Sequence, residues 1–195
     1  MTTICTTFES VSRAVQRLLR SEYVILDCEG RKIGFESGKL SLITIGTPHA
    51  KNIYLFDLFA LNWDALHLLF DSVLSSGSSS RAMTKVVWDG RLDYLELLHH
   101  YNCRLENVLD LQLVDVHSRF QRDANQPENR IFRFSRDDFP VKEVRKYQIG
   151  GIHFLSSFDF ALAEHRVRRV RTRAGEPLIP KTRFPVSSCL FRRVS

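Results

Sequence analysis

The chain has 195 residues, of which 44% are apolar and 26% charged, with nine glycines, six prolines and a net charge of +6. This composition predicts one soluble globular domain with a sizeable core, and it excludes collagen, disordered and disulfide-scaffold proteins. No apolar run approaches the roughly 20 residues of a membrane helix, and no charged head with an apolar stretch indicates a secretory signal.

The first third of the sequence predicts a helix followed by three strands. A capping box at Thr6-x-x-Glu9 and the apolar spacing from Phe8 to Leu19 indicate the helix. The strands are predicted at residues 23–30, 40–47 and 52–57, close enough together to form an antiparallel meander.

Helices and one strand are predicted to alternate after the meander. Asn62 is a suitable cap for a helix over 63–74, and a strand over 84–88 precedes a helix over 91–101 with Leu92, Leu95 and Leu98 facing inward. Three weaker segments follow: an apolar stretch over 108–116, a long loop over 119–138, and a helix over 156–166. The order of elements predicts an α/β fold, with helices flanking a mixed sheet.

The charge is distributed unevenly along the chain. Residues 166–195 contain nine basic residues and one acid, whereas residues 1–165 contain 19 basic and 21 acidic residues. We therefore predict a folded domain over 1–165 and a basic, disordered tail over 166–195. Two interpretations of the tail stay open: a solvated end, or an arm in which Arg168, Arg169 and Arg171 contact nucleic-acid phosphates.

The four cysteines are widely separated, at positions 5, 28, 103 and 189. No C-x-x-C pair is present, so the sequence indicates neither a zinc site nor a thioredoxin-type redox pair. Scattered thiols in a chain without a secretory signal predict reduced cysteines and an intracellular protein of the nucleus or cytoplasm.

Three acids are the best candidates for a functional site. Asp27 and Glu29 are two apart at the end of the most apolar strand, so both carboxylates point to one face of the sheet. Asp93 is a few residues past the strand over 84–88, in the first turn of the next helix. Such carboxylates suit Mg²⁺ or Mn²⁺. The alternatives are surface acids at a strand exit and, for Asp93, a favourable contact with the helix N-terminus.

Two aromatic residues flank these acids. Trp88 and Tyr94 are close in sequence to Asp93 and could stack on the bases of a single strand, which requires no sequence preference. The alternative, which the sequence favours, is that both are core residues.

Five ordered segments resemble the ribonuclease D-like 3′–5′ exonucleases of the DEDD superfamily. They are VILDCEG at 24–30, GKLSLITI at 38–45, IYLFD at 53–57, VVWDGRLDYLEL at 86–97 and NVLDLQ at 107–112. The Asp-Cys-Glu-Gly sequence is most similar to the branch called 3′–5′ exonuclease domain-containing protein 1. The resemblance spans about residues 20–118, with a weaker likeness over 151–165.

The resemblance implies a ribonuclease H-like fold and two-metal hydrolysis of phosphodiesters at the 3′ end of single-stranded RNA or DNA. It implies that Asp27, Glu29 and Asp93 ligate two Mg²⁺ or Mn²⁺ ions. One ion would lower the pKa of an attacking water and the other would stabilise the leaving 3′ oxygen. Asp110 matches a family position that is not a metal ligand, so a structural role is expected for it.

The sequence departs from the family pattern near its end. Active members have a late Tyr-x-x-x-Asp, but Leu155 stands four residues before Asp159, and Gly151 stands four residues after Tyr147. Residues 166–195 contain neither Asp nor Tyr. Two explanations stay open: a truncated, alternatively spliced or wrongly predicted end, or a degenerate member that binds nucleic acid or a protein partner without catalysis.

Overall fold

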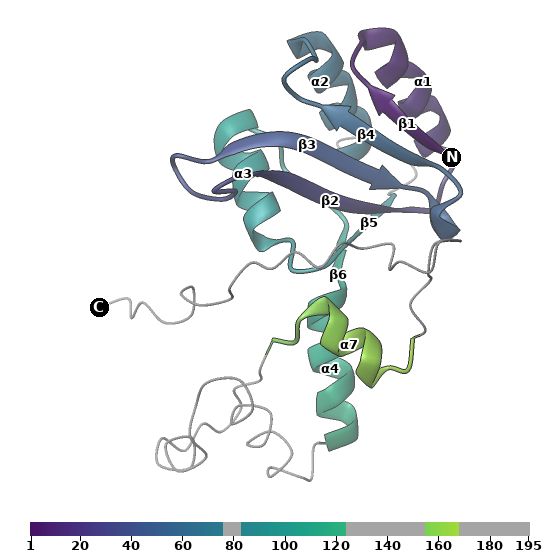
Figure 1. Ribbon diagram of the computed structural model, residues 1–195, viewed down its shortest axis with the longest axis vertical. Helices are drawn as coiled ribbons and strands as arrows, with labels where there is room; N and C mark the ends of the chain where they lie inside the picture. Colours follow the sequence, from purple (N-terminus) through teal and green to yellow (C-terminus); the bar gives the residue numbers. More distant parts are fainter. Residues whose placement is uncertain (76–82, 124–154, 168–195) are drawn as a thin grey trace, which may run out of the picture. The chain divides into compact units, whose positions relative to one another are not determined.

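The computed structural model describes residues 1–75, 83–123 and 155–167 (Figure 1). Residues 1–157 and 158–195 form two units. In the second unit the described part contains one helix, α7 (Phe158–Glu164). The predicted basic tail lies outside the described residues apart from its first two. Within the described ranges, no helix is both long and apolar enough to cross a membrane.

The first unit is built on a mixed six-stranded sheet with the order β1-β4-β3-β2-β5-β6. The strands are β1 (Thr2–Cys5), β2 (Tyr23–Arg31), β3 (Lys39–Gly46), β4 (Ile53–Asp57), β5 (Thr84–Val87) and β6 (Val108–Asp110). The predicted meander is confirmed, because β2, β3 and β4 pair antiparallel. On the other side of β2, β5 and β6 extend the sheet in parallel, and β1 adds in parallel to β4.

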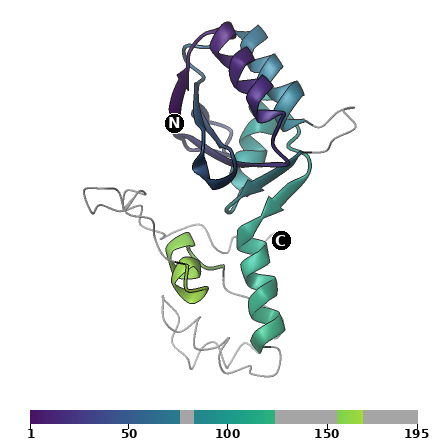
Figure 2. The same cartoon turned by 90° about the vertical axis from the view of Figure 1, so that its right-hand side faces the viewer.

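The helices of this unit connect and flank the strands (Figures 1 and 2). Among the described residues of the unit they are α1 (Phe8–Leu18), α2 (Trp63–Leu69), α3 (Arg91–Tyr101) and α4 (Leu111–Asp123), with a 3₁₀ turn at Pro48–Ala50. Both views show α1 and α2 side by side. The predicted α/β class is therefore confirmed.

The core lies on one face of the sheet. Along β2, Val24, Leu26 and Cys28 are buried, and they join one apolar cluster with residues of α1 and α2 such as Leu18 and Leu69. The intervening residues of β2 point to the opposite, exposed face. This alternation follows from the period of two in a strand, and it places Asp27 and Glu29 away from the core.

Two predicted helix boundaries need correction. The cap of α1 is Thr7, not Thr6, because the helix begins at Phe8 and the Ser10 hydroxyl, three residues after the cap, takes the part expected of Glu9. Asn62 caps α2 as predicted, accepting a bond from the Ala65 N–H. However, α2 ends at Leu69 and the chain continues as a π-helical turn, Phe70–Leu74.

The predicted inner face of α3 is wrong. Leu92 is 45% exposed and Leu95 and Leu98 are half-buried, while Glu96 and Leu97 are fully buried. A polar side chain at the centre of this face hides its apolar pattern in the sequence. Glu96 can be buried there because it finds hydrogen-bonding partners within the fold.

The segment 119–138 is not entirely loop, because residues 119–123 form the last turns of α4. Its buried side includes an ion pair, Arg119 Nε to Asp115 Oδ2 at 2.9 Å, so polarity there does not indicate exposure. The remainder of the predicted loop lies outside the described residues. The short strand β1 is a further element that sequence patterning did not predict.

Candidate active site

The first part of the site is the carboxyl end of β2. This strand pairs with β5 only as far as Ile25 opposite Val86, so Asp27 and Glu29 extend beyond the end of β5. The ladder with β3 shifts register between Glu29 and Gly30. A Cβ at position 30 would collide with the Lys39 carbonyl oxygen, so the close approach of the two backbones requires glycine there. The two acids thus stand on the open face of a firmly paired strand.

The second part is the turn that joins β5 to α3. Asp89 has a left-handed backbone with φ of 54°, and Gly90 is the N-cap of α3 without a side-chain capping bond. The Asp89 side chain therefore does not cap the helix; its Oδ1 accepts a 2.7 Å bond from Arg91 Nε. Asp93 follows in the first turn of α3, as predicted.

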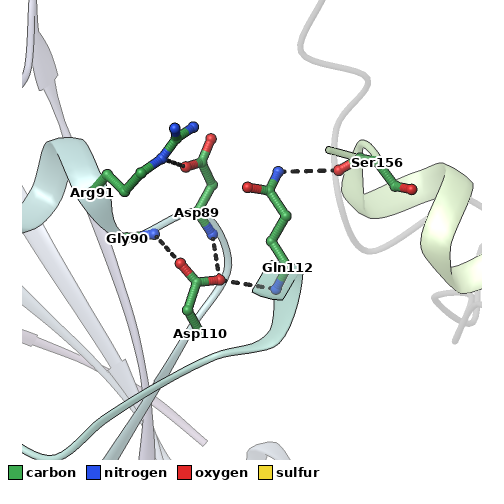
Figure 3. A network of polar contacts seen from close by, with 6 residues as sticks. All are labelled: Asp89, Gly90, Arg91, Asp110, Gln112 and Ser156. Carbon is green, nitrogen blue, oxygen red and sulfur yellow. Dashed lines mark hydrogen bonds and ion pairs between the residues drawn. The ribbon is translucent and has the colours of Figure 1, made fainter. Parts of the chain in front are cut away.

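Asp110 holds this turn in place (Figure 3). Its Oδ1 accepts bonds from the N–H groups of Asp89 at 3.1 Å and Gln112 at 2.8 Å, and its Oδ2 accepts one from the Gly90 N–H at 3.1 Å. The carboxylate thus ties the end of β6 to the turn after β5. These three bonds agree with the structural role expected for Asp110.

Burial raises the pKa of all three acids of the site, and neighbouring negative charges add to the rise for Asp93 and Glu29. The pKa of Asp93 is raised to about 7, first by burial and then by the charges of Asp27, Asp89, Glu29 and Asp110. Burial also raises the pKa of Asp27, although the Cys28 N–H partly offsets it. For Glu29, burial and then the charge of Asp27 raise the pKa. The carboxylates of β2 and α3 therefore lie close enough together for the negative charges of β2 to act on Asp93.

Cys28 and Leu26 lie beneath this group rather than within it. Both are buried, and burial raises the pKa of the Cys28 thiol far above its usual range, with the charges of Asp93 and Asp27 adding to the effect. The thiol is therefore uncharged and packs as an apolar group.

The donor chemistry of the site suits a divalent cation. Mg²⁺ and Mn²⁺ prefer carboxylate oxygens, and a cation would offset the repulsion that adds to the raised pKa values of Glu29 and Asp93. Across residues 1–75, 83–123 and 155–167, no three acidic, His or Cys side chains stand in the arrangement of a metal site.

The two aromatic residues predicted beside the site, Trp88 and Tyr94, differ in their surroundings. Trp88 is half-buried in the turn before α3, and Tyr94 is 36% exposed. Tyr94 lines a shallow, mainly apolar pocket of about 390 Å³ together with Leu95, Leu105 and Val108. Base stacking by these rings stays a prediction. The three predicted arginines of the tail, Arg168, Arg169 and Arg171, lie outside the described residues.

Two polar residues near the site were not predicted. Glu96 is buried one turn after Asp93. Gln112 is buried at the start of α4, and its side-chain amide donates a 3.1 Å bond to the Ser156 carbonyl (Figure 3). The sequence offered only a weak signal for either one: each is a polar residue within a segment of otherwise apolar periodicity.

Comparisons with known proteins support the exonuclease resemblance. The chain is similar to RNase D of Trypanosoma brucei, solved in complex with the RNA U12, with 26% identity and a TM-score of 0.51 over 59% of this chain and 39% of that one. The GMP complex of the same enzyme matches 85% of this chain and 53% of that one, with 20% identity and a TM-score of 0.51. The Nibbler EXO domain of Aedes aegypti has 13% identity and a TM-score of 0.50, over 65% of this chain and 58% of that one.

No protein-family model matches the sequence, and no curated protein matches it significantly. The fold is the ribonuclease H-like α/β fold of exonuclease domains. The neighbours support the DEDD exonuclease superfamily but do not single out the branch that the Asp-Cys-Glu-Gly sequence suggested. The chain spans only about two-fifths of the trypanosomal enzyme that it matches at 26% identity.

Proposed function

We propose that this chain is a 3′–5′ exonuclease-type domain that hydrolyses nucleic-acid phosphodiesters with two divalent cations, Mg²⁺ or Mn²⁺. The observation that supports the proposal most directly is the pKa of Asp93, which burial and then the charges of neighbouring acids, Asp27 and Glu29 among them, raise to about 7. This interaction indicates that the acids of β2 lie close to Asp93 at the carboxyl end of β2. In open α/β sheets, ligands bind beyond the carboxyl ends of the strands. The binding position is the one where the connections that follow two neighbouring strands leave in opposite directions.

The three acids have distinct parts in this proposal. Asp27 and Glu29 hold the cations from a rigid central strand, and Asp93 completes the site from α3. When bound, the cations activate a water nucleophile and stabilise the leaving 3′ oxygen. Cation binding also displaces the proton that Asp93 retains near neutral pH, so binding strengthens as the pH rises through about 7.

The proposed substrate is the 3′ end of single-stranded RNA or DNA. The neighbour from Trypanosoma brucei was solved with RNA, which supports a nucleic-acid substrate here. We propose that the exposed Tyr94, which follows Asp93 in the chain, and the half-buried Trp88 stack on bases. The arginines at 168, 169 and 171 are proposed to contact phosphates, which makes affinity depend on salt and on residues 166–195.

A second candidate function is nucleic-acid or protein binding without catalysis. The observation that favours it is the absence of a Tyr-x-x-x-Asp from residue 147 onward. Asp159 is the second residue of α7, but Leu155 stands at the position where the tyrosine of the motif would be. A site with three acids and no fourth holds its second cation weakly, which lowers the rate of hydrolysis.

Degradation of a 5′-labelled single-stranded RNA and its DNA equivalent separates the two functions. The full chain is assayed with Mn²⁺, Mg²⁺ or EDTA beside Asp27→Ala, with Asp64→Asn, an exposed acid on α2, as matched control. We expect a metal-dependent ladder that shortens from the 3′ end. It should persist in Asp64→Asn and fall by at least about 100-fold in Asp27→Ala.

A folded wild-type protein that gives no ladder with either cation contradicts the catalytic proposal. Salt-dependent binding of the same oligonucleotides by that inactive protein would favour the second candidate. Loss of this binding on deletion of residues 166–195 would locate it in the basic tail.

A further inference from the structure

Glu96 is a fully buried acid that the catalytic proposal does not use. It lies on α3, three residues after Asp93, and its Oε2 accepts a 2.8 Å hydrogen bond from the N–H of Gly34. Gly34 is in the loop that joins β2 to β3, 62 positions earlier in the chain. A buried carboxylate is costly unless it is bonded, so this contact compensates for the burial of Glu96.

His100 is the second partner of this carboxylate. Its Nδ1 lies 3.2 Å from Glu96 Oε1, a charge contact to an oxygen that accepts no hydrogen bond within the described residues. Its Nε2 lies 3.2 Å from the carbonyl oxygen of Glu36, in the same loop as Gly34. The imidazole thus bridges the buried acid and the loop backbone.

The loop between β2 and β3 fits closely against α3 along its length. Gly34 has a left-handed backbone, with φ of 79°, and a Cβ there would lie 2.8 Å from Leu92 Cδ2. A Cβ at Gly38 would collide with Glu96 Oε2. The loop therefore contacts α3 at three successive turns, near Leu92, Glu96 and His100.

This contact connects the two elements that supply the acids of the site. The loop follows β2, which contains Asp27 and Glu29, and α3 contains Asp93. We infer that Glu96 and His100 are positioning residues that lock the β2–β3 loop to α3 and thereby fix the distance between the β2 acids and Asp93. The consequence for cation binding rests on the proposed function, whereas the lock itself does not.

Glu96 substitutions test the lock by two measurements on the full chain. Glu96→Leu fills the space but removes both contacts, whereas Glu96→Gln keeps an acceptor for Gly34 and a polar amide beside the His100 ring. His99→Gln, an exposed neighbour on α3, is the matched control. The readouts are hydrogen exchange of residues 32–38 in EDTA and binding of Mn²⁺ alone.

We expect Glu96→Leu to accelerate exchange in the loop about 10-fold and to weaken Mn²⁺ binding about 10-fold, with Glu96→Gln restoring most of both. His99→Gln should match the wild type. If the Glu96 side chain merely filled space, Glu96→Leu should match the wild type in both readouts, because a leucine often packs as well as a buried acid. Wild-type values for both readouts in Glu96→Leu would overturn the inference.

A second variant keeps the test decisive if Glu96→Leu does not fold. His100→Ala leaves Glu96 and the loop in place but removes the contacts of the ring with Glu96 Oε1 and with the Glu36 carbonyl oxygen, so its loop exchange should also accelerate; unchanged exchange would overturn the lock. If the wild type binds no Mn²⁺, the proposed function is contradicted, and loop exchange alone then decides whether the lock exists.

Discussion

Asp110 and Asp93 lie at the same edge of the sheet but in opposite electrostatic situations. Asp110, at the end of β6, accepts three backbone N–H bonds, from Asp89, Gly90 and Gln112. Asp93 is surrounded by other acids, and its pKa is raised to about 7 by burial and by their charges. Hydrogen bonds thus stabilise the charge of Asp110, whereas burial and neighbouring negative charges disfavour the charge of Asp93.

The difference teaches how to separate a structural acid from a ligand-binding one. Backbone N–H groups are fixed dipoles, so an acid that accepts several of them stabilises the fold by itself. An acid held near like charges destabilises the fold until something positive arrives. Asp110 is therefore expected to matter for stability, and Asp93 for binding.

The largest effect on stability is expected from Asp110→Ala. This substitution leaves three N–H groups without their acceptor and should lower the free energy of unfolding by about 3 kcal/mol, measured by denaturant titration in EDTA. Asp57→Ala is the matched control, because Asp57 accepts bonds from Phe59 and Ala60 in an exposed turn. Its cost should be near 1 kcal/mol. Equal losses in the two variants would contradict the structural assignment of Asp110.

A smaller effect of opposite sign is expected from Asp93→Asn. Because the folded-state pKa of Asp93 is raised from 3.8 to about 7, the folded protein binds the proton more tightly than the unfolded chain. Wild-type stability should therefore fall as the pH rises from about 4 to about 7, and Asp93→Asn should flatten this slope. At pH 8 the variant should be more stable by about 1 kcal/mol, after allowance for solvent screening.

The pH profile in EDTA measures this directly. Stability curves for wild type and Asp93→Asn should converge near pH 4 and separate above it. Curves that stay parallel across that interval would mean that Asp93 does not feel the charges of β2, and the proposed grouping of the three acids would fail.

The positions of the three acids could be predicted from sequence, because they depend on local patterns within single elements. The alternation along β2 places Asp27 and Glu29 on the face opposite Leu26, and a strand followed by a helix start places Asp93 beside them. Both inferences need only the period of an element and the direction of parallel strands.

Features that depend on distant partners could not be predicted. Glu96 looks like a surface residue until Gly34, 62 positions away, is brought against it. The left-handed Asp89 is tolerated because Asp110, 21 positions later, accepts its N–H. The polar residues at the end of α4 suggest a loop from sequence alone. They are compatible with a helix because Arg119 pairs with Asp115 in the interior. Spacing in the sequence does not encode such tertiary contacts.

The central claim is that Asp27, Glu29 and Asp93 together bind divalent cations. Calorimetric titration of the full chain with Mn²⁺ at pH 8 tests it most directly, beside Asp93→Asn and the exposed control Asp64→Asn. The account predicts binding by the wild type and the control, and at least about 10-fold weaker binding by Asp93→Asn. Equal Mn²⁺ affinity in all three proteins, or no binding by folded wild type, would contradict it.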